Sequence, residues 1–433
     1  MKKQKGAVVR MRDCRILREG RIIKEDLWIR NGHIIDPEVL FFEERRSADI
    51  SVDCLFLIAP GFIDIQINGG FGVDFSSCTE DSIEEAIALV RKRLVAYGVT
   101  AFCPTIITSS PALYHQLLPH IKRSEGGLHG AEILGIHLEG PFISKDKKGA
   151  HRLELVRQDL DGGMSELEET YGSLKETAII TIAPELRGCM EAIRYLSQRG
   201  IVVSLGHSGA DIVLAQEAVR NGARCMTHLF NAMPPFHHRD PGMIGLIAQA
   251  KAAPALGQGC LKALASDLTS ASAAQEDVVY FGLIADGVHT HTASLKIAYR
   301  AHPKGAILVT DAISAMGMPV GRHNLAGVEI EVTGDTAHIA GTNTLCGSVA
   351  TMDRCVRSFL TATQCSLVEA LEVASLHPAQ LLGLDRRKGT LAFGADADFV
   401  VLDQDLEVLA TFIAGQCVWR RDEERTRHFV STL

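Results

Sequence analysis

The middle of the chain alternates between two hydrophobic patterns. Short apolar runs rich in β-branched residues recur, usually separated by segments such as 82–98 and 211–222, in which apolar positions return every three to four residues. The first pattern is typical of buried strands and the second of amphipathic helices. Alternating strands and helices indicate a parallel sheet, and eight repeats predict an α/β fold, a closed (β/α)8 barrel of TIM type. The eight runs are Phe62–Asn68, Thr100–Ile107, Ile133–Glu139, Ile179–Glu185, Val202–His207, Arg224–Asn231, Val278–Asp286 and Ala306–Asp311.

The two ends of the chain follow a different pattern. Residues 1–59 and the stretch from about Gly389 onward alternate apolar and polar positions, with turns at Glu19-Gly20 and Asn31-Gly32. We therefore expect residues 1–59 and 389–433 to pair into one small β-sandwich domain, and residues 60–388 to form the barrel. Helical segments near 348–363 and 366–376 are expected to lead from the eighth strand back to the small domain.

One segment of the barrel region fits neither pattern. Residues 249–277 are rich in Ala, Ser and Gly and lack a clear apolar stripe. They are interpreted as a long insert before the seventh strand, and a short amphipathic helix within it is an alternative.

The composition narrows the classes of function. A hydrophobic fraction of 46% is typical of a globular protein, and a formal net charge of −8 disfavours a nucleic-acid partner. No apolar run has the length of a signal peptide or of a membrane span, about 18 residues, so we expect no membrane association. Eleven cysteines without a CxxC pair indicate reduced thiols and a cytoplasmic location.

Metal-ligating side chains stand at the ends of the predicted strands, which is where catalytic groups of such barrels lie. Glu139 ends the third strand, His207 the fifth, and His228 lies in the sixth. One carboxylate oxygen and two imidazole nitrogens form the donor set of a catalytic zinc-type site, which keeps one position open for water. A structural role for each histidine is the alternative.

Two further residues at strand ends are candidates for the chemistry itself. Asp311 ends the eighth strand, where a carboxylate can take a proton from water and later give one to a leaving amine. Its alternative role is to cap the next helix. His289, which follows Asp286 at the end of the seventh strand, can orient a substrate or polarise a carbonyl, unless it is an ordinary loop histidine.

The loop that follows His228 is basic. Arg239 offers a planar fork of donors that suits a phosphate group, and His237 and His238 extend the basic patch. A solvated cluster of charges is the alternative interpretation.

The motifs occur in an order that resembles a known family. They are PGFIDIQINGGFGVDF, HLEGPFIS, LGHSGA, THLFNAMPPFHHRDPG, IADGVHTH and LVTDAISAMG, followed by SLHPAQLLGL and KGTLAFGADADFVVLD. Together they resemble the N-acetylglucosamine-6-phosphate deacetylases of the amidohydrolase superfamily, and look most similar to the animal enzymes. The resemblance covers nearly the whole chain.

The resemblance implies an activity and a site. The reaction is hydrolysis of the acetamide of N-acetyl-D-glucosamine 6-phosphate to D-glucosamine 6-phosphate and acetate, in amino-sugar recycling. Glu139, His207 and His228 would hold one divalent metal ion per subunit, with Asp311 as the catalytic residue. Zinc is expected, with iron, cobalt and manganese as alternatives. The implied sugar phosphate site comprises Ala150, His151, Asn231, Ala232, Arg239, Asp286, Gly287, Val288, His289, Leu345, Cys346 and Gly347.

The resemblance also implies a homodimer, in which Arg239 and His289 serve the phosphate of the neighbouring subunit. Gln66 and Asn68 stand where many superfamily members carry His-x-His, and the fourth strand lacks a bridging lysine, so a single metal is expected. Cys346 stands where this family is expected to have serine. Two other functions remain open: the same metal site acting on a cyclic amide or an aminated base, and a barrel that serves only as a scaffold.

Overall fold

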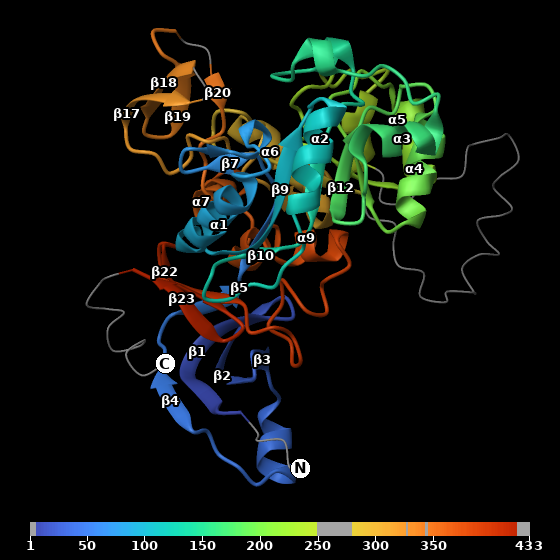
Figure 1. The fold of residues 1–433 in the computed structure, drawn as a ribbon. Coiled ribbons are helices and arrows are strands. Elements are labelled where there is room, and N and C mark those ends of the chain that lie inside the picture. Colours follow the sequence, from blue (N-terminus) through green and yellow to red (C-terminus); the bar gives the residue numbers. More distant parts are fainter. Residues whose placement is uncertain (1–5, 249–278, 326–327, 343–344, 422–433) are drawn as a thin grey trace, which may run out of the picture.

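The computed structural model describes residues 6–248, 279–325, 328–342 and 345–421. Within these ranges the predicted fold class is confirmed. Eight parallel strands form a nearly closed barrel, and strands from both ends of the chain share a separate sheet (Figure 1). The predicted insert at 249–277 lies outside the described residues.

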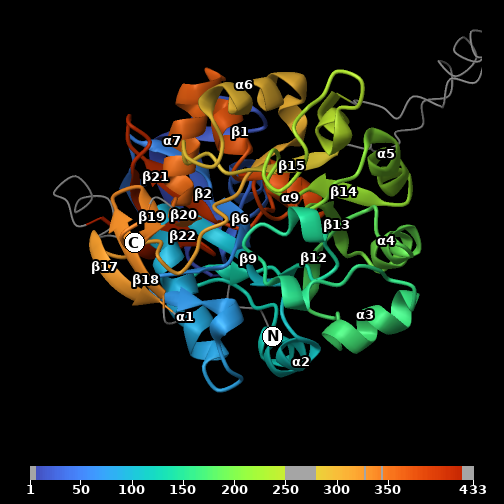
Figure 2. The ribbon, with the colours of Figure 1, turned by 90° about the horizontal axis from the view of Figure 1, so that it is seen from above.

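The barrel strands follow one another around the ring in the order of the chain (Figure 2). The ring closes where the backbone N–H of Asp311 donates to the Gln66 carbonyl and that of Asn68 donates to the Ala312 carbonyl, each over 2.9 Å. Each predicted strand corresponds to an observed one: β6 (Phe62–Ile67), β9 (Val99–Ile107), β11 (Ile136–Glu139), β12 (Thr177–Ile182), β13 (Val202–Leu205), β14 (Ala223–Met226), β15 (Tyr280–Leu283) and β16 (Ala306–Leu308).

The third predicted strand, 133–139, is interrupted. Gly135 has a φ of 128°, and a Cβ at this position would lie 2.8 Å from the Glu176 carbonyl oxygen. Glycine therefore permits a bend that other residues would resist. The bend separates β10 (Glu132–Ile133) from β11 and leaves Glu139 as the last residue of a short strand.

Most helices lie around the ring, whereas α9 (Leu376–Leu381) packs against side chains of the barrel strands through Ala379 and Leu381. Several helices begin at the capping residues that the sequence displays. Ser110 caps the helix that starts at Pro111, Asp211 caps the one that starts at Ile212, and Ser366 with Glu369 forms a capping box on the one that starts at Leu367. The bounds are α1 (Ile83–Leu94), α2 (Pro111–Leu117), α3 (Gly163–Tyr171), α4 (Cys189–Gln198), α5 (Ile212–Arg220), α6 (Thr292–Ala301), α7 (Met352–Thr363), α8 (Leu367–Glu372) and α9 (Leu376–Leu381). None of the helices in the described ranges is long and apolar enough to cross a membrane.

The small domain joins strands from the two ends of the chain, blue and red in Figure 1, in one curled sheet. Phe399 and Phe412 face each other across two strands with ring centroids 4.5 Å apart, and burying each side chain contributes roughly 1.5–3 kcal/mol. The predicted boundaries at 59/60 and 388/389 stay predictions. The strands are β1 (Val8–Arg18), β2 (Arg21–Arg30), β3 (His33–Ile34), β4 (Ile50–Asp53), β5 (Leu57–Pro60), β21 (Phe399–Leu402), β22 (Val408–Ile413) and β23 (Gln416–Arg420).

A second small sheet, orange in Figure 1, follows the eighth barrel strand and was not predicted. It has its own core, to which Ile330, Val332 and Ala337 contribute. The alternating residues 328–333 and the turn at Gly334-Asp335 were signals that point to such a hairpin. Its antiparallel strands are β17 (Gly321–Leu325), β18 (Val328–Thr333), β19 (Thr336–Ile339) and β20 (Leu345–Gly347).

Candidate active site

The barrel topology brings four of the predicted residues to one rim. Glu139 is the last residue of β11, whereas His207, His228 and Asp311 lie two or three residues beyond β13, β14 and β16. These last three have φ values of 50°, 27° and 46°, in the left-handed region that non-glycine residues rarely adopt. Such strain costs on the order of 1–3 kcal/mol per residue and concentrates at functional sites.

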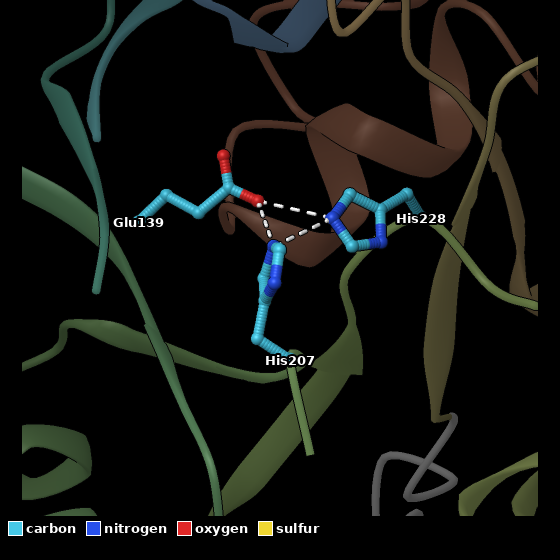
Figure 3. A group of neighbouring side chains, drawn as sticks. All are labelled: Glu139, His207 and His228. Carbon is cyan, nitrogen blue, oxygen red and sulfur yellow. Dashed lines mark hydrogen bonds and ion pairs between the residues drawn. The ribbon is translucent and has the colours of Figure 1, made fainter. Parts of the chain in front are cut away.

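Three side chains converge at the centre of this rim (Figure 3). The Nε2 atoms of His207 and His228 each lie 3.1 Å from Oε1 of Glu139, and 3.0 Å from each other. Metal–donor distances of about 2.0–2.2 Å in tetrahedral geometry separate ligands by about 3.3 Å. The spacing of the three donors therefore fits one divalent ion.

The hydrogen-bond pattern around the triad also fits a metal. Nδ1 of His207 lies 2.9 Å from the Lys147 carbonyl, which can only accept, so this nitrogen carries the hydrogen and Nε2 presents a lone pair. Nδ1 of His228, by contrast, is buried and has no hydrogen-bond partner among the described residues, whereas most metal-ligating histidines donate from this second nitrogen. Burial lowers the pKa of His228, but the hydrogen bond and charge of Glu139 raise it more, to about 9. The triad thus favours positive charge at its centre.

Two amides hold the carboxylates beside the triad. Nε2 of Gln66 donates to Oε1 of Glu139 over 3.1 Å and to Oδ1 of Asp311 over 3.3 Å. Nδ2 of Asn68 donates to the same Asp311 oxygen over 2.8 Å. Gln66 and Asn68 are the residues that stand in place of the His-x-His of many superfamily members, and their N–H groups point at the carboxylates. Burial and the charge of Glu139 raise the pKa of Asp311 to about 7.

His289 is held by Asp286. Nδ1 of the ring lies 2.6 Å from Oδ2 of Asp286, whose other oxygen accepts the backbone N–H groups of Val288 and His289 at 2.9 and 2.8 Å. The hydrogen bond to Asp286 raises the pKa of His289. The aspartate therefore fixes the ring and leaves Nε2 for another partner.

His151 packs against the metal-ligand candidates from the loop after β11. Its ring lies 4.4 Å from that of His207, and Nδ1 lies 2.6 Å from the Thr108 hydroxyl. Burial, together with the charge of His207, lowers the pKa of His151 to about 3. The imidazole is therefore neutral near pH 7.

A pocket of about 340 Å³ opens over these groups, a size that suits a small ligand. Arg239 is exposed on its loop, and the predicted residues Asp286, Gly287, Val288 and Leu345 are likewise not among the lining residues. The substrate-binding roles of these five residues stay predictions. The predicted binding residues that do line the pocket are Ala150, His151, Asn231, Ala232, His289, Cys346 and Gly347.

Several residues that line the pocket were not predicted from the sequence. Ser314 and Ser348 enter from the segments on either side of the second small sheet, and the N–H of Ile313 ties these segments together by donating to the Ser348 carbonyl over 2.9 Å. Ser314 lies within the LVTDAISAMG motif, which was a usable signal. The remaining unassigned residues of the lining are Asp74, Ile107, Gly149, Ile284 and Ile313.

Comparison with known proteins identifies the family of the chain. The model of the amidohydrolase family matches residues 57–418. The N-acetylglucosamine-6-phosphate deacetylases of Bos taurus and Homo sapiens are each 54% identical to the chain, over 97% and 98% of it and 98% and 100% of their own lengths.

A solved structure has the same fold. The N-acetyl-D-glucosamine-6-phosphate deacetylase of Mycobacterium smegmatis, a mutant in complex with N-acetyl-D-glucosamine-6-phosphate, superposes with a TM-score of 0.74 at 28% identity. The match covers 95% of this chain and 99% of that one. The chain described here therefore belongs to the amidohydrolase family and, within it, to the N-acetylglucosamine-6-phosphate deacetylases.

Proposed function

We propose that this protein hydrolyses the acetamide of N-acetyl-D-glucosamine 6-phosphate to D-glucosamine 6-phosphate and acetate, a step of amino-sugar catabolism. The observation that carries the proposal is the convergence of Glu139, His207 and His228 beside Asp311 in a pocket of sugar size. The relatives that match nearly the whole chain support the same substrate.

Glu139, His207 and His228 are the residues that would hold the metal, which supplies Lewis-acid chemistry that polarises the amide carbonyl and acidifies water. Asp311 accepts a proton from the attacking water as the water oxygen bonds to the acetyl carbon. Asp311 then donates this proton to the sugar nitrogen as the C–N bond breaks. Burial raises the pKa of Asp311 above its ordinary value, toward the range in which a group both accepts and donates near neutral pH.

His289 and His151 act on the bound substrate rather than on the proton. Because Asp286 holds Nδ1 of His289, the opposite ring nitrogen is free to bind the amide oxygen or the sugar. The neutral ring of His151 packs on His207 and narrows the pocket on the side of the metal. Both rings are therefore assigned to orienting the acetamide, in line with the advantage of a pre-positioned substrate.

We assign zinc to this site. Two imidazole nitrogens and one carboxylate oxygen match catalytic zinc sites with a fourth, open position. Iron, cobalt and manganese accept the same donors, so selective reconstitution is the deciding measurement.

We also propose that the protein is a cytoplasmic homodimer. Arg239 is exposed and stands outside the lining of its own pocket, where it is free to reach the phosphate in a neighbouring subunit. Arg239→Ala should raise KM with little change in kcat, while sedimentation should show a dimer. The free state of the cysteines in the described ranges suits a reducing compartment.

Acetate release tests the proposed function directly. Protein stripped by a chelator should be inactive, and adding back single divalent metals should restore turnover, most fully with zinc. N-acetylglucosamine without the phosphate is the matched control and should be turned over far more slowly. Equal turnover of the two sugars, or full activity of the stripped protein, would contradict the proposal.

A further inference from the structure

A second cavity, of about 480 Å³, lies where three parts of the fold meet, and we call it the junction cavity. The barrel contributes Tyr97 and the first turns of α7, the second small sheet contributes Val332 of β18, and the terminal domain contributes Trp419 of β23. Its size falls in the range of small-molecule sites. The proposed reaction does not use it.

The cavity wall carries charges of both signs. Arg357 forms ion pairs with Asp353 at 2.9 Å and with Glu407 at 3.3 Å, and Arg421 reaches Glu407 at 2.9 Å. Arg354 joins them one turn earlier on α7. Arg354 is itself paired with Asp335, in the turn between β18 and β19. Three guanidinium groups thus stand among three carboxylates, and a wall with charges of both signs suits a ligand that carries both a phosphate and an ammonium group.

Two buried polar atoms of the wall have no partner among the described residues. They are Oγ1 of Thr351 and Oδ1 of Asp353, whose residues are each only 7% exposed and both line the cavity. Buried polar atoms in native proteins are nearly always hydrogen-bonded, so each such exception needs an explanation. Both atoms lie behind the cavity surface, so they mark a wall segment whose hydrogen bonding is incomplete.

Two aromatic side chains, Tyr97 and Trp419, line the same cavity. Aromatic rings present apolar faces on which the C–H groups of a sugar ring can pack, while polar groups around them fix the ligand's orientation. Guanidinium, carboxylate, hydroxyl and aromatic groups together suit a phosphorylated amino sugar better than an apolar ligand.

The junction cavity shares two wall segments with the catalytic pocket. Ile313 and Ser314 line the catalytic pocket, and Ala315, the next residue, lines the junction cavity. In the second segment, Ser348 lines the catalytic pocket and Val349 the junction cavity. The Ile313 N–H donates to the Ser348 carbonyl, so the two segments that border both cavities are also tied to each other.

We propose that the junction cavity binds an amino-sugar phosphate and that its occupancy changes the affinity of the catalytic pocket. Glucosamine 6-phosphate, which carries one phosphate and one ammonium group, is the ligand of this class that the proposed reaction releases. The choice of this ligand rests on the proposed function. The effect on the catalytic pocket is reciprocal, because coupling between two sites acts equally in both directions.

Trp419 offers a direct probe, since the chain has two tryptophans and the other, Trp28, packs on Phe41 in the terminal domain. The metal-loaded Trp28→Phe protein is titrated with glucosamine 6-phosphate while Trp419 emission is recorded. Arg354→Gln is then added as the test variant. Arg199→Gln, whose arginine lies over Tyr195 away from both cavities, is the matched control.

We expect a saturable change in Trp419 emission whose Kd rises at least tenfold in Arg354→Gln and is unchanged in Arg199→Gln. In the parent protein, added glucosamine 6-phosphate should inhibit acetate release with a non-competitive component. This component should be absent in Arg354→Gln, whereas KM and kcat measured without added product should equal those of the parent. An emission change of equal Kd in both variants, or none in the parent, overturns the proposal. The emission readout needs no turnover, so this failure is distinct from a failure of the proposed deacetylation.

Discussion

Two regions of the molecule each bring three acidic or imidazole groups within ligand distance of one another. One is the triad of Glu139, His207 and His228 on the barrel rim. The other, which we call the foot cluster, joins Glu132 of β10 to Asp396 and Asp398 at the junction with the small domain. Both are buried, and their geometry alone does not distinguish them.

In the foot cluster, a lysine side chain of the protein itself supplies the positive charge between the carboxylates. Nζ of Lys388 lies 2.7 Å from Glu132 and 2.9 Å from Asp396 and also pairs with Asp398. Glu139, in contrast, has Gln66, His207 and His228 as its side-chain partners among the described residues. Three close donors therefore indicate a metal site only where no lysine or arginine of the chain already occupies their centre.

The largest effect is expected from removing a donor of the rim triad. His228→Ala should reduce bound metal from about one ion per chain to a small fraction, and acetate release on the order of 10⁴-fold, because the ion's chemistry is lost. Metal content and turnover are measured on the same preparation. Asp396→Asn in the foot cluster is the control, and loss of metal from this variant instead would reverse the comparison.

Asp311→Asn should leave the metal in place and remove the proton carrier. We expect kcat to fall roughly 10³-fold, within the range of about 10²–10⁴ typical for general acid–base groups. Metal content and melting temperature should match the parent protein. Near-normal turnover would exclude Asp311 from the mechanism.

Lys388→Met tests the foot cluster, where the expected effect is on stability and not on chemistry. Leaving buried carboxylates without their cation should lower the free energy of unfolding by about 3–5 kcal/mol, measured by denaturant titration. The exposed Lys175→Met is the matched control. The folded fraction should keep the parental kcat, and a selective loss of kcat would assign the cluster a catalytic role.

The loss of stability in Lys388→Met should depend on pH. Burial lowers the pKa of Lys388, but Asp398 and Glu132 raise it more, above its ordinary value. The folded chain therefore holds this proton more tightly than the unfolded chain. Between neutral pH and about pH 10 the stability gap between parent and Lys388→Met should stay constant, and it should shrink as the pH rises through the raised pKa. A gap that widens at high pH would contradict this assignment.

The smallest effect is expected from the amide that links the two carboxylates of the rim. Gln66→Ala removes hydrogen bonds to Glu139 and Asp311, and the loss of such an orienting partner typically costs about 10–100-fold in activity or metal affinity. We expect the lower end, about tenfold in kcat. An increase in bound metal to two ions per chain would show that this amide excludes a second site.

Much of the rim was predictable from sequence because barrel topology converts positions along the chain into neighbours. Once Glu139, His207, His228 and Asp311 were placed at strand ends, the parallel ring required them to share one face. Arg239 shows the limit of this reasoning, because a long loop after a strand carries its side chain away from the pocket that the strand end lines.

The foot cluster was beyond sequence reasoning. Its ion pairs join residues such as Glu132 and Arg387, which are 255 positions apart, and no periodic pattern connects them. The sheet that follows the eighth strand, β17 to β20, has alternating apolar and polar residues that could have been recognised. The barrel pattern instead predicted that the eighth strand leads directly to helices. The segments on either side of this sheet also line the catalytic pocket. Their position there depends on the tertiary contact in which Ile313 donates to Ser348, which the sequence does not reveal.

Anomalous diffraction at the zinc edge from crystals of the zinc-loaded protein tests the central claim most directly. The account predicts one strong peak within bonding distance of Glu139, His207 and His228, and none at Glu132, Asp396 and Asp398. A peak at the foot cluster, or a rim triad that stays without one at saturating zinc, would contradict it.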